Sequence, residues 1–311
     1  MTPGHPALAI TVGGLDLQNP VLLAGGTAAF GREVAGVIDL QALGGLVTKA
    51  VSVEPRQGAP APRVAEFAGG MINAIGLANP GVDAVQRDAL PWLAQHLRRT
   101  RVLVNVVGNR VEDYAEVVRR LAAEPGKDGF ELNVSCPNVK AGGLEFGADR
   151  QALAAVVRGA RQTTSLPLFV KLSPTLGDIA DAARVAMDAG ASGISLTNTL
   201  PGLVVDVTRR RPALGYGSGG VSGPALLPVA VLATWRVYKA TGAPIVGVGG
   251  VSTAGEALQL LMAGARAVAI GTAALRDPRT PERVVRDLGR WMDRHGIRSV
   301  ETVVGSLSWP S

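Results

Sequence analysis

The chain has a single cysteine, Cys136, among 311 residues, so it can form neither an internal disulfide nor a Cys₄ zinc or iron–sulfur site. We therefore expect a reducing compartment, the cytoplasm, and no metal site on this chain. No run of 18 apolar residues occurs, and residues 1–14 lack a basic segment followed by a long apolar core, which predicts no membrane span and no secretory signal. The net charge is +6, but aromatic residues make up only 4% and do not interleave with basic runs, so nucleic-acid binding is disfavoured.

Short apolar runs alternate with amphipathic stretches along the whole chain, a pattern typical of a parallel sheet built from βα units. Eight such runs occur: Val21–Ala24, Gly45–Thr48, Val102–Val106, Phe130–Asn133, Leu168–Leu172, Gly193–Leu196, Ile245–Val248 and Ala267–Ile270. Each run is almost continuously apolar, as buried parallel strands are. Because eight parallel strands close a barrel, we predict an α/β fold, a (β/α)₈ TIM barrel formed by residues 1–311 as one domain.

The segments between the runs complete this prediction. Helical faces are predicted in Val82–Leu97, Val111–Leu121, Asp149–Thr164 and Ile179–Ala189. The N-terminal segments Leu8–Val12 and Leu15–Leu17 predict a β-hairpin that caps the lower end of the barrel. The long segment Glu54–Pro80 is expected to fold over the carboxyl-terminal rim. A second long segment, Leu200–Gly223, is either functional or a solvated basic loop.

In a (β/α)₈ barrel the chemistry lies at the carboxyl ends of the strands, and here those positions are polar or glycine-rich. They are Gly25-Gly26-Thr27, Thr48-Lys49, Asn105, Asn133 with Cys136, Lys171 with Ser173, Asn198-Thr199, Gly249-Gly250 and Gly271-Thr272. The last two pairs follow the seventh and eighth strands, where such barrels commonly bind a phosphate group. The rim asparagines Asn73, Asn133, Asn138 and Asn198 could read the N–H and C=O groups of a pyrimidine. Lys171 could stabilise a reduced, anionic ring, and Lys49 could bridge that ring and the substrate.

Cys136 is the candidate general base of this rim. It follows an apolar strand within Glu131–Asn138, where neighbouring polar groups can lower the pKa of a thiol. The alternative is a small, inert, buried side chain. None of the three histidines lies in the rim segments, which favours the cysteine. The sequence Gly215–Gly220 matches the G-x-G-x-x-G pattern, but it follows no buried strand, so we do not expect a Rossmann dinucleotide site.

Taken together these motifs resemble the class 1 dihydroorotate dehydrogenases, FMN-containing barrels of pyrimidine biosynthesis. The resemblance rests on Phe30–Glu33, Thr48–Ala50, Pro62-Arg63, Gly70–Gly81, Glu131–Lys140 with Gly142-Gly143, Val170–Pro174, Asn198-Thr199, Gly219–Pro224, Gly249-Gly250 and Gly271-Thr272. The Asn138-Val-Lys-Ala-Gly-Gly143 continuation is similar to subfamily 1B. The catalytic subunit of that subfamily pairs with a separate subunit that carries FAD and a 2Fe–2S cluster and passes electrons to NAD.

The resemblance implies a role for each rim residue. Cys136 would take the C5 proton of dihydroorotate while a hydride passes from C6 to N5 of FMN, with Lys49 beside the reacting groups. Substrate would be held by Lys49, Asn73, Ala74, Ile75, Gly76, Leu77, Asn133, Asn138, Asn198 and Thr199. FMN would be held by Gly25, Lys49, Ala50, Asn105, Asn133, Lys171, Thr197, Gly223, Gly249, Gly250, Gly271 and Thr272. The assembly implied is a homodimer core within a heterotetramer.

Two departures and several alternatives accompany this reading. The family often has serine at the position of Gly25, and Phe-Gly at that of Ala28-Ala29, so a side-chain contact to the flavin is lost at Gly25. One alternative is a fumarate-dependent 1A enzyme or a dihydropyrimidine-type dehydrogenase. Others are a non-redox barrel isomerase or synthase that binds a phosphorylated ligand, and a non-catalytic subunit that binds FMN.

Overall fold

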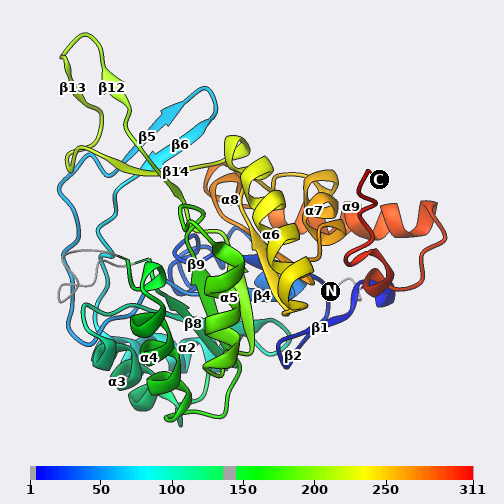
Figure 1. Cartoon of the computed structure of the whole chain (residues 1–311), viewed down its shortest axis with the longest axis horizontal. Coiled ribbons are helices and arrows are strands. Elements are labelled where there is room, and N and C mark those ends of the chain that lie inside the picture. The colour runs from blue at the N-terminus through cyan, green and yellow to red at the C-terminus, as the bar shows by residue number, and fades with distance from the viewer. Residues whose placement is uncertain (1–4, 136–144, 311) are drawn as a thin grey trace.

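Eight parallel strands form a closed barrel in the computed structural model, which describes residues 5–135 and 145–310 (Figure 1). The strands are β3 (Val21–Leu23), β4 (Gly45–Val47), β7 (Arg101–Val106), β8 (Gly129–Asn133), β9 (Leu168–Leu172), β10 (Gly193–Leu196), β15 (Ile245–Val248) and β16 (Ala267–Ile270). They follow one another in chain order around the barrel, which closes between β16 and β3. Every strand lies on one of the eight predicted apolar runs, so the predicted barrel is confirmed.

Helices surround the barrel on the outside. They are α1 (Val82–Ala84), α2 (Leu90–His96), α3 (Val111–Leu121), α4 (Arg150–Arg161), α5 (Ile179–Asp188), α6 (Leu227–Thr241), α7 (Ala254–Met262), α8 (Thr272–Arg276) and α9 (Thr280–Arg294). The predicted apolar face of α4 is buried at Leu153, Val156, Val157 and Ala160. The apolar stripe therefore places each helix against the sheet, as amphipathic periodicity requires.

Two units depart from the regular pattern. Between β3 and β4 the chain forms turns and a short 3₁₀ helix, η2 (Leu40–Ala42), in place of an α-helix. The C-terminal helix α9 contacts β3 and covers the strand there. The helix predicted over Val82–Leu97 is interrupted by a π-helical turn, η3 (Val85–Ala89), between α1 and α2.

The N-terminal hairpin, β1 (Ile10–Val12) with β2 (Leu15–Leu17), closes the lower end of the barrel. Its turn is so close to the barrel that a Cβ atom on Gly13 would lie 2.7 Å from the Phe169 ring. Gly13 also has a φ of +52°, which favours glycine. Arg266, directly before β16, donates a hydrogen bond of 2.7 Å to the carbonyl oxygen of Thr11. The predicted cap is confirmed, and it leaves the opposite end of the barrel for chemistry.

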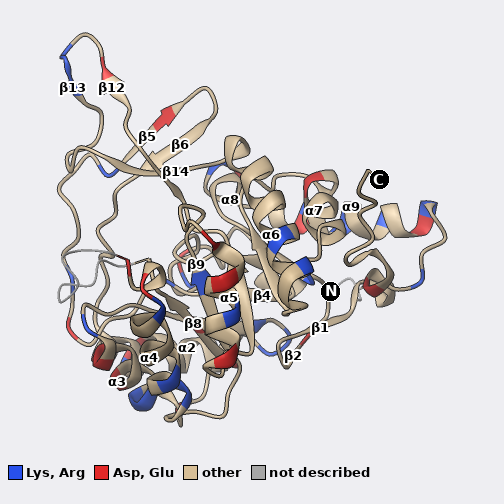
Figure 2. Cartoon of the chain, in the orientation of Figure 1, with Lys and Arg blue, Asp and Glu red and all other residues tan. Residues whose placement is uncertain are grey.

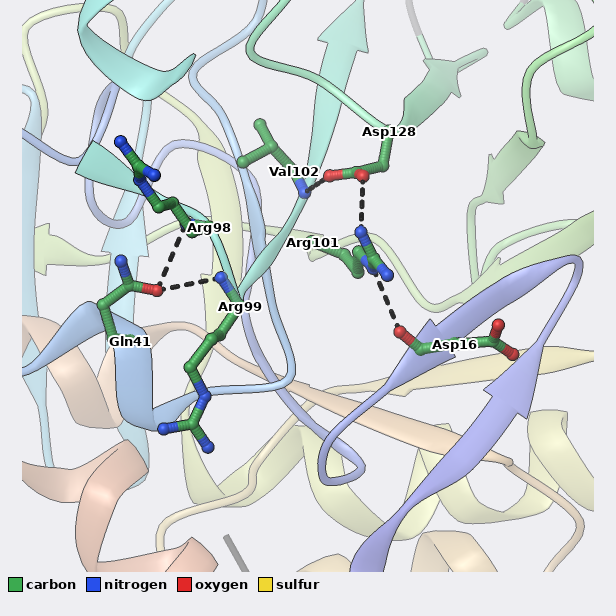
Figure 3. Close-up of polar contacts among 7 residues, drawn as sticks. All are labelled: Asp16, Gln41, Arg98, Arg99, Arg101, Val102 and Asp128. Carbon is green, nitrogen blue, oxygen red and sulfur yellow. Dashed lines mark hydrogen bonds and ion pairs between the residues drawn. The ribbon is translucent and has the colours of Figure 1, made fainter. Parts of the chain in front are cut away.

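A polar cluster at the start of β7 fixes the hairpin to the barrel (Figure 3). The Arg101 guanidinium donates to the carbonyl oxygen of Asp16 in the hairpin and to the carboxylate of Asp128, each at a distance of 3.1 Å. The other Asp128 oxygen accepts the backbone N–H of Val102 at 2.8 Å. The Gln41 side chain accepts two backbone N–H groups of the loop that leads into β7. One arginine thus links the cap to two strands.

The two long excursions pair with each other, which the sequence did not predict. Glu54–Pro80 contains β5 (Val64–Phe67) and β6 (Gly70–Asn73), and Leu200–Gly223 contains β11 (Leu200–Gly202) and β14 (Gly219–Ser222). These strands form one antiparallel sheet in the order β11-β14-β6-β5. A smaller hairpin, β12 (Val205–Asp206) with β13 (Arg211–Pro212), extends from this sheet away from the barrel (Figure 1). Both excursions therefore lie at the carboxyl-terminal ends of the barrel strands.

Charged residues of both signs are interleaved on the outer helices α3, α4 and α5 (Figure 2). Arg119 pairs with Glu116 within α3, and Asp181 on α5 pairs with both Arg150 and Arg184. Many arginines are therefore neutralised locally on this side. Within residues 5–135 and 145–310, no helix combines the length and apolar character needed to cross a membrane.

Candidate active site

A buried carboxylate, Glu131 of β8, lies at the centre of the polar end of the barrel. It is 1% exposed, and each of its oxygens accepts a hydrogen bond of 2.7 Å. The donors are the Asn105 amide from β7 and the Ser195 hydroxyl from β10. Three strands are thereby joined inside the barrel. The sequence analysis assigned no role to Glu131 or Ser195, although a polar residue inside an apolar strand is a recognisable signal of such a contact.

Lys171 of β9 is a second buried charge in the same region. It is 7% exposed and lies in register with Asn133 on β8 and Ser195 on β10. No hydrogen bond or ion pair joins its ammonium group to any residue of the described part of the chain. A buried cation is normally paired or hydrogen-bonded. Lys171 is therefore available to bind an acceptor or an anion from a ligand.

Lys49 follows β4 at the same rim, and its backbone N–H donates to the carbonyl oxygen of Ala29 at 2.7 Å. Burial lowers the pKa of the Lys49 ammonium below its ordinary value, and the positive charge of Arg63 lowers it further. Two cations are thus close together at this side of the rim. An anionic ligand between them would stabilise the charged form of Lys49. The next residue, Ala50, is buried and has only a methyl side chain, so any hydrogen bond that it makes to a ligand must come from its backbone.

The predicted asparagines of β8 and β10 meet. The Asn198 amide donates to the side-chain oxygen of Asn133 at 3.2 Å, and the Tyr114 hydroxyl donates to the Asn133 carbonyl oxygen at 3.0 Å. The backbone N–H of Thr199 donates to the Asn198 side-chain oxygen at 2.9 Å. These contacts fix the orientation of two amide groups. The buried Thr197 hydroxyl, directly before them, has no hydrogen-bond partner among the described residues.

The excursion sheet brings Asn73 to this group. Asn73 ends β6, pairs with Gly220 of β14, and donates its amide to the Gly220 carbonyl oxygen at 3.2 Å. A Cβ atom on Gly220 would lie 2.0 Å from the Thr199 hydroxyl, so β14 packs directly against the end of β10. The predicted substrate segment Ala74–Leu77 follows as a turn, with positive φ at Gly76 and Leu77. Residues far apart in the sequence therefore converge on one side of the rim.

The predicted phosphate segments also converge. Gly223 follows β14 and begins the 3₁₀ turn η6 (Pro224–Leu226), which leads into α6. Gly250, after β15, is so close to α6 that an added Cβ atom would lie 2.5 Å from the Leu227 Cβ. The Thr272 hydroxyl at the start of α8 donates to the Ser222 hydroxyl at 2.8 Å. The ends of β14, β15 and β16 therefore lie together, with Gly249 and Gly271 in the same loops.

Gly25 lies above the Glu131 cluster. A Cβ atom added there would be 3.3 Å from the Asn105 amide nitrogen and 3.5 Å from a Glu131 carboxylate oxygen. A side chain at position 25 would thus be directed toward these two polar groups. Two predicted residues, Cys136 and Asn138, lie outside the described part of the chain. Ser135, directly before Cys136, is described, and its backbone N–H donates to the Asn133 side-chain oxygen at 3.4 Å.

Comparison with known proteins identifies the family of the chain. The family model described as dihydroorotate dehydrogenase matches residues 7–292. A protein of Desulforudis audaxviator named dihydroorotate dehydrogenase B (NAD(+)), catalytic subunit, is 49% identical over 298 residues, covering 96% of each chain. A Geobacter sp. protein of the same name is 44% identical, over 97% of this chain and 99% of its own.

A relative from Solibacter usitatus is 47% identical over 98% of this chain and 99% of its own, and its provisional name is dihydroorotate dehydrogenase A (fumarate). The crystal structure of dihydroorotate dehydrogenase from Eimeria tenella, in complex with ferulenol, superposes with a TM-score of 0.82 at 26% identity. It covers 97% of this chain and 88% of that chain. The chain is an oxidoreductase that belongs to the dihydroorotate dehydrogenase family.

Proposed function

We propose that this enzyme oxidises (S)-dihydroorotate to orotate in the synthesis of UMP, with FMN as its bound cofactor. The observation that carries the proposal is the buried residue Lys171, whose ammonium group has no acceptor among the described residues and which pairs in register with Asn133, the partner of the Asn198 amide. A planar ligand rich in N–H and C=O groups matches these donors and acceptors.

FMN fits the rim on three observations from different strands. Lys171 offers a free cation, Thr197 offers a buried hydroxyl without a partner among the described residues, and the loop around Gly250 has no room for a side chain. The residues proposed to hold FMN are Gly25, Lys49, Ala50, Asn105, Asn133, Lys171, Thr197, Gly223, Gly249, Gly250, Gly271 and Thr272. When bound, FMN supplies a two-electron acceptor for the substrate hydride.

The side chains of the chain itself would bind and deprotonate the substrate. Lys49 would bind the substrate carboxylate, since an anion beside it would offset the burial and the positive charge of Arg63 that lower the pKa of its ammonium group. The proposed substrate contacts are Lys49, Asn73 to Leu77, Asn133, Asn138, Asn198 and Thr199. Cys136 would remove the C5 proton as the general base, a role proposed from its motif in the sequence.

The electron acceptor is proposed to be NAD, reached through a separate subunit that carries FAD and a 2Fe–2S cluster. This is supported by the relatives that are named NAD-linked catalytic subunits. It is also supported by the single cysteine, which leaves no cluster ligands on this chain. A fumarate-dependent enzyme is the second candidate, because one relative at 47% identity is named for fumarate. Turnover of fumarate by the chain alone would favour that candidate, and reduction by NADH only with a partner present would exclude it.

The proposed assembly is a cytoplasmic homodimer core within a heterotetramer. An exposed apolar surface on the segment that carries the β12–β13 hairpin, made of Leu203, Val205, Val207 and Tyr216, is available for contact with another subunit.

The test is anaerobic mixing of the purified protein with dihydroorotate while the visible absorption of the flavin is recorded. We expect rapid bleaching of the wild type. We expect Cys136→Ser to keep FMN but to lose most flavin reduction, because a serine hydroxyl is a far weaker proton acceptor. A yellow protein that dihydroorotate does not bleach would refute the substrate, and a protein that cannot be loaded with FMN would refute the cofactor. Wild-type reduction rates in Cys136→Ser would refute the role of the cysteine.

A further inference from the structure

The Asn105 side chain lies at the rim between two segments that are proposed to hold FMN. The backbone N–H of Asn105 donates to the Thr48 hydroxyl at 3.2 Å, and Thr48 directly precedes Lys49. A Cβ atom added to Gly25 would lie 3.3 Å from the Asn105 amide nitrogen. Asn105 is buried, with 3% of its surface exposed. Because an amide carries a donor at one end and an acceptor at the other, its direction decides which atom Asn105 offers to a ligand.

The Glu131 carboxylate fixes this direction. Its Oε1 atom accepts a hydrogen bond of 2.7 Å from the Asn105 Nδ2 atom. A carboxylate has acceptors and no donors, so only the nitrogen end of the amide can face it. The Oε2 atom accepts the Ser195 hydroxyl at 2.7 Å, and Glu131 and Ser195 are both buried. The carboxylate is thus held from two strands and cannot turn away from Asn105 without the loss of a buried hydrogen bond.

The Asn105 Oδ1 atom remains as the free acceptor of this pair. No residue of the described chain donates a hydrogen bond to it. If the amide were turned over, Oδ1 would face the Glu131 Oε1 atom, acceptor against acceptor, and a buried carboxylate oxygen would lose its donor. Such a loss is costly, so the turned amide is strongly disfavoured. Asn105 consequently offers a ligand a hydrogen-bond acceptor in a fixed position.

We propose that Glu131 is a positioning residue, which holds the Asn105 amide so that its oxygen accepts a hydrogen bond from an N–H group of the bound ligand. Oxidised FMN has one N–H group in its ring system, at N3, so Asn105 selects the pyrimidine end of the ring. Glu131 acts through Asn105 and not by its own contact with the ligand. This inference rests on the proposed function, because it takes FMN as the ligand of Asn105.

The experiment exchanges the amide and the carboxylate between the two positions. Asn105→Asp alone places two carboxylates face to face with no donor between them, and should weaken FMN binding about tenfold or more. Asn105→Asp combined with Glu131→Gln keeps the wild-type net charge and reverses the pair. The new glutamine can donate to the new aspartate, which still offers an acceptor to the ligand. We expect this double variant to bind FMN within about threefold of the wild type, close to the usual error of additivity.

Ser195→Ala is the matched control, because it removes the other hydrogen bond of Glu131 and leaves the Asn105 contact in place. It should bind FMN like the wild type. The FMN affinity is measured from the fluorescence of released flavin, at a temperature at which all of these proteins are folded. With ¹⁵N-labelled FMN, the N3–H proton resonance reports its acceptor directly. We expect this resonance to lie downfield in the wild type, the control and the double variant, and to move upfield in Asn105→Ala.

A double variant that binds FMN no better than Asn105→Asp would overturn the inference, as would an N3–H resonance that Asn105→Ala leaves unchanged. Wild-type affinity in Asn105→Asp would also overturn it, because the pair would then serve the fold alone. Urea denaturation of the FMN-free proteins tests the pair without the cofactor: Asn105→Asp should lower the free energy of unfolding, and the double variant should recover most of the loss. A wild type that cannot be loaded with FMN would refute the proposed cofactor, whereas the urea comparison would still show whether Glu131 holds Asn105.

Discussion

Replacement of Lys171 by methionine should lower the affinity for FMN and leave the stability of the FMN-free protein almost unchanged. Lys171 is buried, and no described residue accepts a hydrogen bond from its ammonium group. Its removal therefore leaves no described partner without a hydrogen bond. Methionine has a similar length and flexibility and fills the same space without a charge. The variant should differ from the wild type mainly in what it binds.

The magnitude follows from the kind of contact that is lost. A hydrogen bond to a charged group contributes about 1.5–3 kcal/mol, so Lys171→Met should weaken FMN binding by about 10- to 150-fold. The free energy of unfolding of the FMN-free protein should change by no more than about 1.5 kcal/mol, the usual limit for replacements that conserve volume. We therefore expect a large loss of FMN affinity with little change in the free energy of unfolding.

FMN binding can be measured by the fluorescence of the flavin as it is released, and folding by urea denaturation of the FMN-free protein. Lys239→Met is the matched control, because Lys239 is an exposed lysine of α6 and its removal changes the net charge equally. The reasoning is refuted if Lys171→Met binds FMN as tightly as Lys239→Met does. It is also refuted if the FMN-free variant loses more than about 3 kcal/mol, the range in which an unpaired buried charge is created.

Three further predictions test other parts of the rim. Ser195→Ala removes one of the two hydrogen bonds to Glu131 and should lower the free energy of unfolding, measured by urea denaturation, by about 1.5–3 kcal/mol. A loss below about 0.5 kcal/mol would show that the contact does not stabilise the fold. Gly250→Ala should lower the free energy of unfolding by about 1–3 kcal/mol and should also lower the affinity for FMN. Gly250 has a φ of +77°, and the new Cβ atom would lie 2.5 Å from the start of α6. Gly177→Ala is the control, because an added Cβ atom there would meet no other atom within 4 Å. The pKa of Lys49 is lowered in the folded protein, so between this lowered pKa and pH 10.5 unfolding takes up a proton and the free energy of unfolding should rise with pH. Lys49→Met should flatten this rise. An equal slope in both proteins would exclude Lys49 as its source.

The barrel strands were predictable because buried parallel strands form continuous apolar runs, and such runs need no knowledge of their partners. The predicted run Leu168–Leu172 coincides with β9 although it contains a lysine. The segment between β3 and β4 was harder, since its turns and 3₁₀ helix carry no periodic signal. The sequence therefore located the strands well and the irregular connections poorly.

The sheet above the rim could not be predicted by the same reasoning. Met71 pairs with Ser222, about 150 positions later, and the strand Gly219–Ser222 has neither apolar alternation nor β-branched enrichment. Its pairing is specified by close packing. An added Cβ atom on Gly219 would lie 2.5 Å from the Asn73 carbonyl oxygen, and one on Gly220 would overlap Thr199. Glycines at these positions read as a loop in the sequence, but in the structure they permit a close approach between strands.

Hydrogen bonding within the fold distinguishes two charged residues of adjacent barrel strands, Glu131 and Lys171. Each oxygen of Glu131 accepts a hydrogen bond, one from Asn105 and one from Ser195, so this carboxylate joins three strands of the barrel. The Lys171 ammonium, on the adjacent strand, has no bonded partner in the described chain. A sequence lists both as polar residues near strand ends and cannot say which is satisfied by the fold. The bonds of Glu131 to two other strands assign it to the scaffold, and the unused hydrogen-bonding capacity of the Lys171 ammonium assigns Lys171 to ligand binding.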